Sequence, residues 1–279
     1  MRASPAADVA HEAERFAETV AAAVARHPTP DPWRPGAAVS DSVRELEVVL
    51  MDAGWDDLGE DAALLAYVAP AAAALGRGFA SLRPVDRLLG GALRSGRLAR
   101  YAGAGGERFV TPRAGRLELS EAAGVEPLPY ADSLGVAAVA ATRALEPVEG
   151  DEAERRMRAW TAASAGYLAG VCEEALRLAL EHTRSRIAFG RPLSALEPVQ
   201  QTLADAATLV EGLHLLTSDE PGAEQLLYAG DAAVRAVAGC QQVTGALGFT
   251  LEFPLQRAQR RVRASRAWSE AVLAAWEAG

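Results

Sequence analysis

The chain has 279 residues, enough for one or two domains with a large hydrophobic core. Half of the residues are hydrophobic, with abundant alanine and leucine, and this composition favours a helix-rich globular protein. The net charge of −9 argues against a nucleic-acid-binding protein, because binding to phosphates requires an excess of basic residues.

Signals of location and metal binding are weak. The two cysteines, Cys172 and Cys240, lie in apolar helical patterns, which is typical of buried free thiols in a reducing compartment. The first residues lack the apolar core of a signal peptide, and no run reaches the roughly 18–20 apolar residues of a membrane span. The four histidines are scattered, so no metal site is predicted. We expect a cytoplasmic protein that binds neither membranes nor nucleic acids.

Residues 1–98 are predicted to form an N-terminal helical region. An alanine-rich amphipathic pattern comes first and ends at the proline-rich segment 27–32, which is expected to be a stiff loop. Capping residues and glycines mark the limits of the later helices. The four predicted helices span 5–26, about 41–54, 60–76 and 84–97.

The pattern changes after Ala99. Residues 103–106 have the glycine content of a turn, and short β-type segments follow between proline and glycine breaks. We therefore predict a reduced β segment over residues 99–150. Its three expected strands are at 108–111, 117–119 and 136–139.

Helical periodicity resumes at about residue 151 and continues to the end of the chain. In the first of four segments, Met157, Trp160 and Ser164 recur at spacings of three and four. The same spacing recurs over about 196–213 and 226–237, and a fourth helical segment follows Pro254. Four antiparallel helices with such apolar faces make a bundle. The predicted fold class is mostly α, with a C-terminal four-helix bundle at 151–279.

The first motif, R-S-R-I-A-F-G-R-P-L, begins at Arg184 and joins the first two of these helices. On the residues alone, Arg186 is best interpreted as a helix C-terminal arginine near the last carbonyls, and Phe189 as a core side chain. The functional alternative is that a fixed guanidinium and a flat apolar face bind a phosphate and an aromatic ring.

The second motif, Q-Q-V-T-G-A-L-G-F, begins at Gln241 and is followed by L-E-F-P at 251–254. Small residues at the end of a helix are a common structural device, and Gly248 is a candidate C-cap. In their order and separation, the two motifs resemble the C-terminal helical domain of the acyl-CoA dehydrogenases, which are flavoproteins. The family patterns read approximately R-x-x-F-G-x-x-(I/L) and Q-x-x-G-G-x-G-(F/Y)-x-x-E-(F/Y)-P.

This resemblance extends from about Asp151 to the end of the chain and is weaker over Val43–Leu75, where the turn that begins at Trp55 is similar to a family turn. It implies an acyl-CoA dehydrogenase-like fold whose middle β domain is cut down. The family's T-E-P-x-x-G-S-D loop, which contacts the flavin and the substrate, has no counterpart between Gly90 and Gly135.

The resemblance also implies a FAD site that is shared across a subunit interface. Arg186 matches the residue that reaches a neighbour's FAD pyrophosphate, and Phe189 matches the residue near the adenosine portion. Leu193 matches an apolar neighbour. Glu197 stands where the family commonly has glutamine, and a carboxylate near a pyrophosphate is electrostatically unfavourable.

The resemblance implies that the second motif contacts the same FAD. Gln242, Gly245 and Ala246 match the backbone that lies against the ADP part of FAD. Ala246 replaces the second glycine of the family pair, which hinders a close backbone approach by one methyl group.

The catalytic base is where the sequence departs from the family. The family's glutamate, which removes the substrate's α-proton, falls on Ser269, with Trp268 before it. The family's alternative base position falls near Trp160. Glu270 is one residue on, rotated by roughly 100° on a helix, and is expected to be a surface residue. The catalytic residue is therefore unknown, with Glu270 as the candidate.

These features predict a non-catalytic or half-site subunit of an acyl-CoA dehydrogenase. It would pair with a full-length homologue that carries the glutamate, in an α2β2 assembly similar to the heteromeric members that act on steroid side chains. That assembly would convert an acyl-CoA into its α,β-enoyl form with FAD. The alternatives are an autonomous homodimeric enzyme that uses Glu270, and a helical scaffold that no longer binds flavin.

Overall fold

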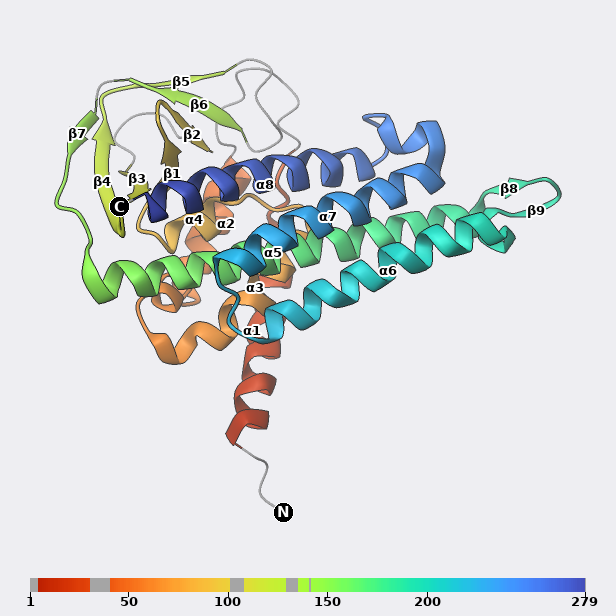
Figure 1. The fold of residues 1–279 in the computed structure, drawn as a ribbon, viewed down its shortest axis with the longest axis horizontal. Helices are drawn as coiled ribbons and strands as arrows, with labels where there is room; N and C mark the ends of the chain where they lie inside the picture. The colour runs from red at the N-terminus through yellow and green to blue at the C-terminus, as the bar shows by residue number, and fades with distance from the viewer. Residues whose placement is uncertain (1–4, 31–40, 101–107, 129–134, 141, 279) are drawn as a thin grey trace.

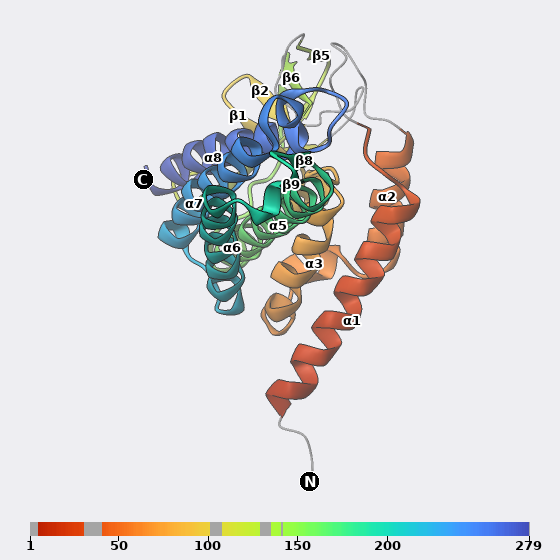
Figure 2. The same ribbon diagram turned by 90° about the vertical axis from the view of Figure 1, so that its right-hand side faces the viewer.

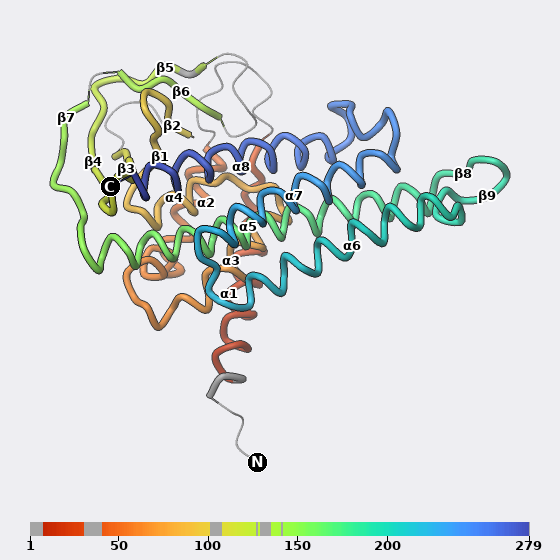
Figure 3. Tube along the Cα trace, in the orientation of Figure 1, coloured from red at the N-terminus to blue at the C-terminus, as the bar shows by residue number. Residues whose placement is uncertain are grey.

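The computed structural model describes residues 5–30, 41–100, 108–128, 135–140 and 142–278. Its C-terminal half is a bundle of four long helices that alternate in direction (Figures 1 and 3). This confirms the predicted bundle, whose apolar positions at spacings of three and four face one core. The helices are α5 (Gly150–Ser185), α6 (Glu197–Ser218), α7 (Ala223–Thr244) and α8 (Leu255–Glu277).

The N-terminal helices cover one side of α5. The helix α3 lies between α1 and α5 (Figure 2), and its backbone approaches α5 closely because the facing positions are small. Three of the four predicted N-terminal helices are confirmed. The described helices are α1 (Pro5–Arg26), α2 (Asp41–Asp52), α3 (Leu65–Arg77) and the short α4 (Arg83–Arg87), with 3-10 turns at Asp56–Gly59 and Ala62–Leu64.

The helix predicted over 84–97 is wrong beyond Arg87. Gly90 has a φ of +105°, which ends the helical path, and the chain then enters a strand at Ala92. A Cβ at Gly91 would lie 2.6 Å from the carbonyl oxygen of Arg108, so the close approach to the neighbouring strand requires a glycine there. Strand pairing therefore overrides the local helical pattern at this point.

The middle of the chain forms one curled sheet of seven short strands in the order β5-β6-β2-β1-β3-β4-β7. The three predicted strands correspond to β3, β4 and β6. Of the four that were missed, β1 lies within the pattern interpreted as a helix over 84–97, and β2, β5 and β7 have only three residues each. The turn predicted at 103–106 lies outside the described residues, as does the end of the proline-rich segment. The strands are β1 (Ala92–Ser95), β2 (Leu98–Arg100), β3 (Arg108–Arg113), β4 (Arg116–Ala122), β5 (Val125–Pro127), β6 (Val136–Val139) and β7 (Thr142–Ala144).

The sheet is attached to the end of α8. Ala114 and Gly115 have φ values of +50° and +72°, which makes the tight turn between β3 and β4. Their N–H groups donate to the carbonyl oxygens of Ala275 and Trp276, at 2.9 and 3.0 Å. The turn thus satisfies carbonyls that the last turn of a helix leaves without partners.

One large hydrophobic core connects all three regions, and a second, smaller cluster around Phe109 lies within the sheet. The large core includes Trp55 from the N-terminal helices, Leu93 from the sheet and Tyr167 from α5. Cys172 and Cys240 are buried free thiols within it, as predicted, and burial raises the pKa of the Cys240 thiol to about 12. In the described part of the chain, no helix is long and apolar enough to cross a membrane.

Candidate functional site

The first motif forms a β-hairpin that projects from the end of α5. The N–H of Arg186 donates to the carbonyl oxygen of His182 at 2.9 Å and so caps the helix. The chain then pairs as β8 (Ile187–Ala188) with β9 (Arg191–Pro192), and the N–H of Leu193 returns to the carbonyl oxygen of Arg186 at 2.9 Å. The interhelical turn predicted over 184–193 is thus a defined hairpin.

The tip of this hairpin presents an aromatic ring to solvent. Phe189 is 91% exposed, so the interpretation of this residue as a core side chain is wrong. Its φ is +53° and that of Gly190 is +76°, and a positive φ is uncommon for a bulky residue. A strained, exposed aromatic residue is a common feature of binding sites.

Three arginines belong to the hairpin and to the helical turn that precedes it. Arg184, Arg186 and Arg191 are exposed, and within the described residues none of them takes part in an ion pair. In a chain with a net charge of −9, this is a local concentration of unpaired positive charge. Because guanidiniums bind phosphate oxygens well, the hairpin has the donors that a diphosphate requires.

The second motif forms a 3-10 turn over Gly245–Phe249 at the end of α7. Gly245 has φ 61° and ψ −145°, a conformation that essentially only glycine adopts. A Cβ at Gly248 would lie 2.2 Å from the Thr244 hydroxyl, and the Gln241 side-chain amide donates to the Gly248 carbonyl oxygen at 3.2 Å. The backbone shape is therefore fixed by glycines and by one buried glutamine.

The six residues predicted to contact the cofactor lie at one end of the bundle, because α5 and α7 both end there (Figure 1). Arg186, Gln242, Gly245 and Ala246 are exposed, and a Cβ built at Gly245 meets nothing within 4 Å. This open backbone fits a flat group laid against it. The two motifs also expose five apolar side chains at this end: Ile187, Phe189, Leu247, Phe249 and Leu251.

Glu197, the first residue of α6, is also exposed. A carboxylate in the first helical turn interacts favourably with the helix dipole. This gives Glu197 a structural role beside the hairpin. Leu193 is half-buried in the 3-10 turn that precedes α6.

The two positions matched to the family's bases lie elsewhere, inside the protein. Trp160 and Ser269 are buried, at 0% and 4% exposure. The indole N–H of Trp160 donates to Asp86 Oδ1 at 3.2 Å. Trp268, next to Ser269, lies under the guanidinium of Arg100, 5.5 Å from the ring centroid.

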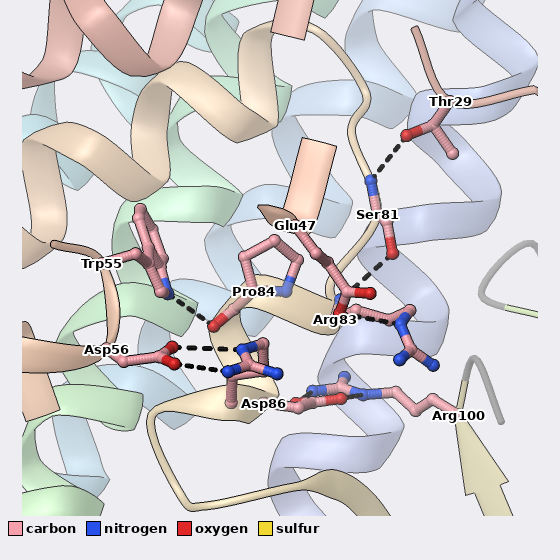
Figure 4. A network of polar contacts seen from close by, with 10 residues as sticks. Thr29, Glu47, Trp55, Asp56, Ser81, Arg83, Pro84, Asp86 and Arg100 are labelled. Carbon is pink, nitrogen blue, oxygen red and sulfur yellow. Dashed lines mark hydrogen bonds and ion pairs between the residues drawn. The ribbon is translucent and has the colours of Figure 1, made fainter. Parts of the chain in front are cut away.

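A buried ion pair between Asp86 and Arg100 joins these two tryptophans (Figure 4). Arg100 donates from Nε at 2.9 Å and again from Nη2, so the contact is bidentate. Both side chains are almost fully buried, with Arg100 2% exposed and Asp86 1% exposed. We call Asp86, Arg100, Trp160 and Trp268 the buried cluster.

Sequence reasoning missed Asp86, whose carboxylate contacts Trp160 at one of the two matched base positions. Its signal was weak, a charged residue inside a short helical pattern. Its carboxylate already accepts three hydrogen bonds and has no access to solvent. A general base must reach the proton that it removes, so Asp86 in this arrangement has a structural role as the partner of Arg100.

Glu270 lies on the surface of α8. Its carboxylate accepts a hydrogen bond from Arg266 Nε at 2.8 Å, and Arg266 also contacts Asp231 at 3.0 Å. Glu270 is about four turns along α8 from Leu255, which lies at the end that carries both motifs. The structure does not bring Glu270 together with the predicted cofactor residues.

Beside the buried cluster lies a charged cavity of about 470 Å³ between the N-terminal helices, the sheet and α5. Several of its arginines are already paired, as Arg83 is with Glu47 and Arg87 with Asp56 (Figure 4). Its charges are balanced, so it has no evident preference for an anion. Within the described residues, no group of histidine, cysteine and carboxylate side chains could hold a metal ion. The charged lining residues are Glu47, Asp56, Glu60, Arg83, Arg87, Arg108, Glu121 and Arg156.

Comparison with known proteins shows which proteins the chain is similar to. Residues 153–219 match the family model "Acyl-CoA dehydrogenase, C-terminal domain". One relative is cyclohex-1-ene-1-carbonyl-CoA dehydrogenase of Geobacter metallireducens, 33% identical over 118 residues, which are 38% of this chain and 31% of that protein. The match thus spans about a third of the curated relative's length.

Solved structures extend the likeness to the whole chain. A chain of the ChsE4–ChsE5 complex from Mycobacterium tuberculosis superposes with a TM-score of 0.67 at 18% identity, over 98% of this chain and 95% of that chain. A variant of the Tcur3481–Tcur3483 steroid ACAD gives a TM-score of 0.65 at 17% identity, over 96% and 97%. At these identities the likeness concerns the fold.

The fold, the two bundle-end motifs and the sequence matches therefore agree. Together they support a member of the acyl-CoA dehydrogenase family, whose C-terminal domain residues 153–219 match and whose fold the described chain shares.

Proposed function

We propose that this chain is the non-catalytic subunit of a heteromeric acyl-CoA dehydrogenase. It would contribute FAD contacts to a partner subunit that carries the catalytic glutamate. One observation carries this proposal: the cofactor-type residues are exposed at the end of the bundle, whereas the matched base positions are closed by the buried cluster. The similar fold in the ChsE4–ChsE5 complex supports it, because that protein is itself a complex.

The exposed residues fit the diphosphate and adenosine parts of FAD. The Arg186 guanidinium would bind the pyrophosphate, and the Phe189 ring would lie against the adenosine portion. The open backbone at Gly245, flanked by Gln242 and Ala246, would lie along the ADP part. When bound, FAD supplies the hydride acceptor, and this chain's residues bind and orient it.

Among the described residues, no accessible carboxylate lies at the matched base positions to remove the substrate's α-proton. Ser269 is buried, and a serine without an added base cannot take the role of a carboxylate. The substrate of the assembly would be an acyl-CoA. One structural neighbour is a steroid ACAD, which makes a bulky acyl chain the proposed substrate class.

The homodimeric alternative depends on Glu270 as the base. The ion pair of Glu270 with Arg266 and its distance from both motifs argue against that role. A scaffold without flavin would leave the three exposed guanidiniums and Phe189 without a ligand.

The first test compares the chain expressed alone with the chain expressed beside a full-length homologue from the same genome. We expect a colourless protein alone and a yellow complex with bound FAD. Arg186→Ala should weaken FAD retention in the complex by about 1.5–3 kcal/mol, the value of a hydrogen bond to a charged group. The control is Arg158→Ala, an exposed arginine near the other end of α5, which should leave FAD retention unchanged.

Two results would contradict the proposal. One is unchanged FAD affinity in the Arg186→Ala complex. The other is a chain that, alone and reconstituted with FAD, reduces an electron-acceptor dye with an acyl-CoA and loses this activity in Glu270→Gln. That second result would identify an autonomous enzyme with Glu270 as its base.

A further inference from the structure

The two predicted cofactor motifs are connected by an aromatic contact that neither motif predicts. The His182 imidazole and the Phe253 ring meet edge to face, with centroids 5.9 Å apart and an angle of 62° between the rings. His182 lies in the last turn of α5, and Phe253 directly precedes Pro254 and α8. Both side chains are half-buried.

Each ring is linked to one of the two motifs through the backbone. The carbonyl oxygen of His182 accepts the N–H of Arg186 at 2.9 Å, so a shift of His182 moves the start of the hairpin. On the other side, the N–H of Phe253 donates to Thr250 at 3.3 Å, and the N–H of Thr250 donates to Leu247 at 3.0 Å. A shift of Phe253 therefore moves the 245–249 turn.

The His182 imidazole lies near the positive charge of Arg186 but is itself uncharged near neutral pH. Burial and the nearby Arg186 lower the pKa of His182 below its ordinary value of 6.5. Near neutral pH the ring is therefore uncharged, and it offers Phe253 a neutral aromatic partner.

We propose that the His182–Phe253 contact sets the distance between the Arg186 hairpin and the 245–249 turn, and that His182 is a positioning residue for FAD binding. This inference depends on the proposed function, because it concerns the same cofactor. A flat, extended ligand that contacts both motifs needs them at a fixed separation, and small misplacements of binding groups are costly. The hairpin strands have only two residues each and cannot supply that rigidity themselves.

The test uses His182→Leu, which keeps an apolar side chain but removes the ring, and His182→Phe, which keeps the ring. Phe253→Leu repeats the change from the other side, and Glu181→Gln is the neighbouring exposed control. Amide hydrogen exchange of the full chain reports the hairpin and the 245–249 turn, and FAD retention is measured in the complex with the full-length homologue.

We expect faster exchange in both segments of His182→Leu and Phe253→Leu, and FAD retention weaker by about 2- to 12-fold, the range for one aromatic pair. His182→Phe should restore both readouts. If Arg186→Ala releases FAD but His182→Leu does not, the positioning role is overturned while the proposed function stands. If neither variant releases FAD, both the proposed function and the cofactor role of His182 are overturned.

Discussion

At the scale of single residues, the Asp86–Arg100 pair has the largest expected energetic consequence. Two charges removed from water gain little net stability from each other, but either one alone in the interior is very costly. Arg100 has a further contact with the Trp268 ring, and Asp86 with the Trp160 indole. The buried cluster is therefore an interdependent unit, in which the loss of one charge leaves the other without its main partner.

We predict that Asp86→Ala destabilises the fold by about 3–5 kcal/mol, because it leaves the Arg100 guanidinium buried and uncompensated. The double variant Asp86→Leu/Arg100→Met should recover most of this loss. Denaturant unfolding followed by circular dichroism measures both. Glu121→Gln, which breaks the more exposed pair with Arg143, is the control and should change stability by less than about 1 kcal/mol. A double variant as unstable as Asp86→Ala would show that the pair itself is needed.

At the scale of elements, the contact between α3 and α5 depends on glycines. A Cβ at Gly166 would lie 2.3 Å from the carbonyl oxygen of Ala69, and a Cβ at Gly170 would lie 2.0 Å from that of Ala73. These neighbours are backbone atoms, which cannot move without displacing a helix. The two glycines, one turn apart, thus set the distance between the N-terminal layer and the bundle.

Gly170→Ala should therefore destabilise the protein by about 1–3 kcal/mol through overpacking, despite the higher helix propensity of alanine. Gly212→Ala in α6 is the matched control, because a Cβ there meets nothing within 4 Å. That change should stabilise by about 0.5–1 kcal/mol. Urea midpoints of the two variants should move in opposite directions, and a shift in the same direction would mean that α3 can move away from α5 at little cost.

At the scale of the whole molecule, a polar contact connects the N-terminal helix α3 with two helices of the bundle, α5 and α6. Glu173 of α5 accepts a hydrogen bond from Arg77 of α3 at 3.0 Å and lies 3.4 Å from Nε2 of His214 in α6. The contact with His214, followed by that with Arg77, lowers the pKa of the Glu173 carboxyl from 4.5 to about 2. Because the folded-state pKa is lowered, this group stabilises the fold above pH 4.5 and loses that effect as the pH falls towards 2.

The expected result is a pH-dependent difference between the wild type and Glu173→Gln. Since the carboxyl is 42% exposed, the destabilisation at pH 7 should be only about 0.2–1 kcal/mol. The difference should shrink below pH 4.5 and disappear near pH 2. Thermal unfolding midpoints across this range measure it, with Glu154→Gln as a surface control on the same helix. An unchanged difference between pH 7 and pH 3 would show that Glu173 does not titrate in this way.

Local sequence patterns were sufficient to locate the long helices of the bundle and the two motifs. Apolar residues at spacings of three and four must share one face of a helix, so the bundle over α5 to α8 followed from local periodicity. Gly190 and Pro192 in the first motif and Gly245 in the second interrupt the helical pattern, which is why both motifs could be assigned to the segments between helices. The resemblance of the motifs then indicated the family without any knowledge of the packing.

The burial of individual side chains and the contacts between distant residues depended on the packing of the whole chain. Phenylalanine is usually a core residue, yet Phe189 lies at the tip of the hairpin and is exposed to solvent. Asp86 meets Arg100 and Trp160, which are 14 and 74 residues away along the chain, and no local pattern encodes such a contact. The three-residue strands β2, β5 and β7 likewise depend on partners supplied by the sheet, because so few residues have too little periodicity to specify a strand. The strand β1 lies in a segment whose local pattern is helical, and its pairing with β2 and β3 overrides that pattern.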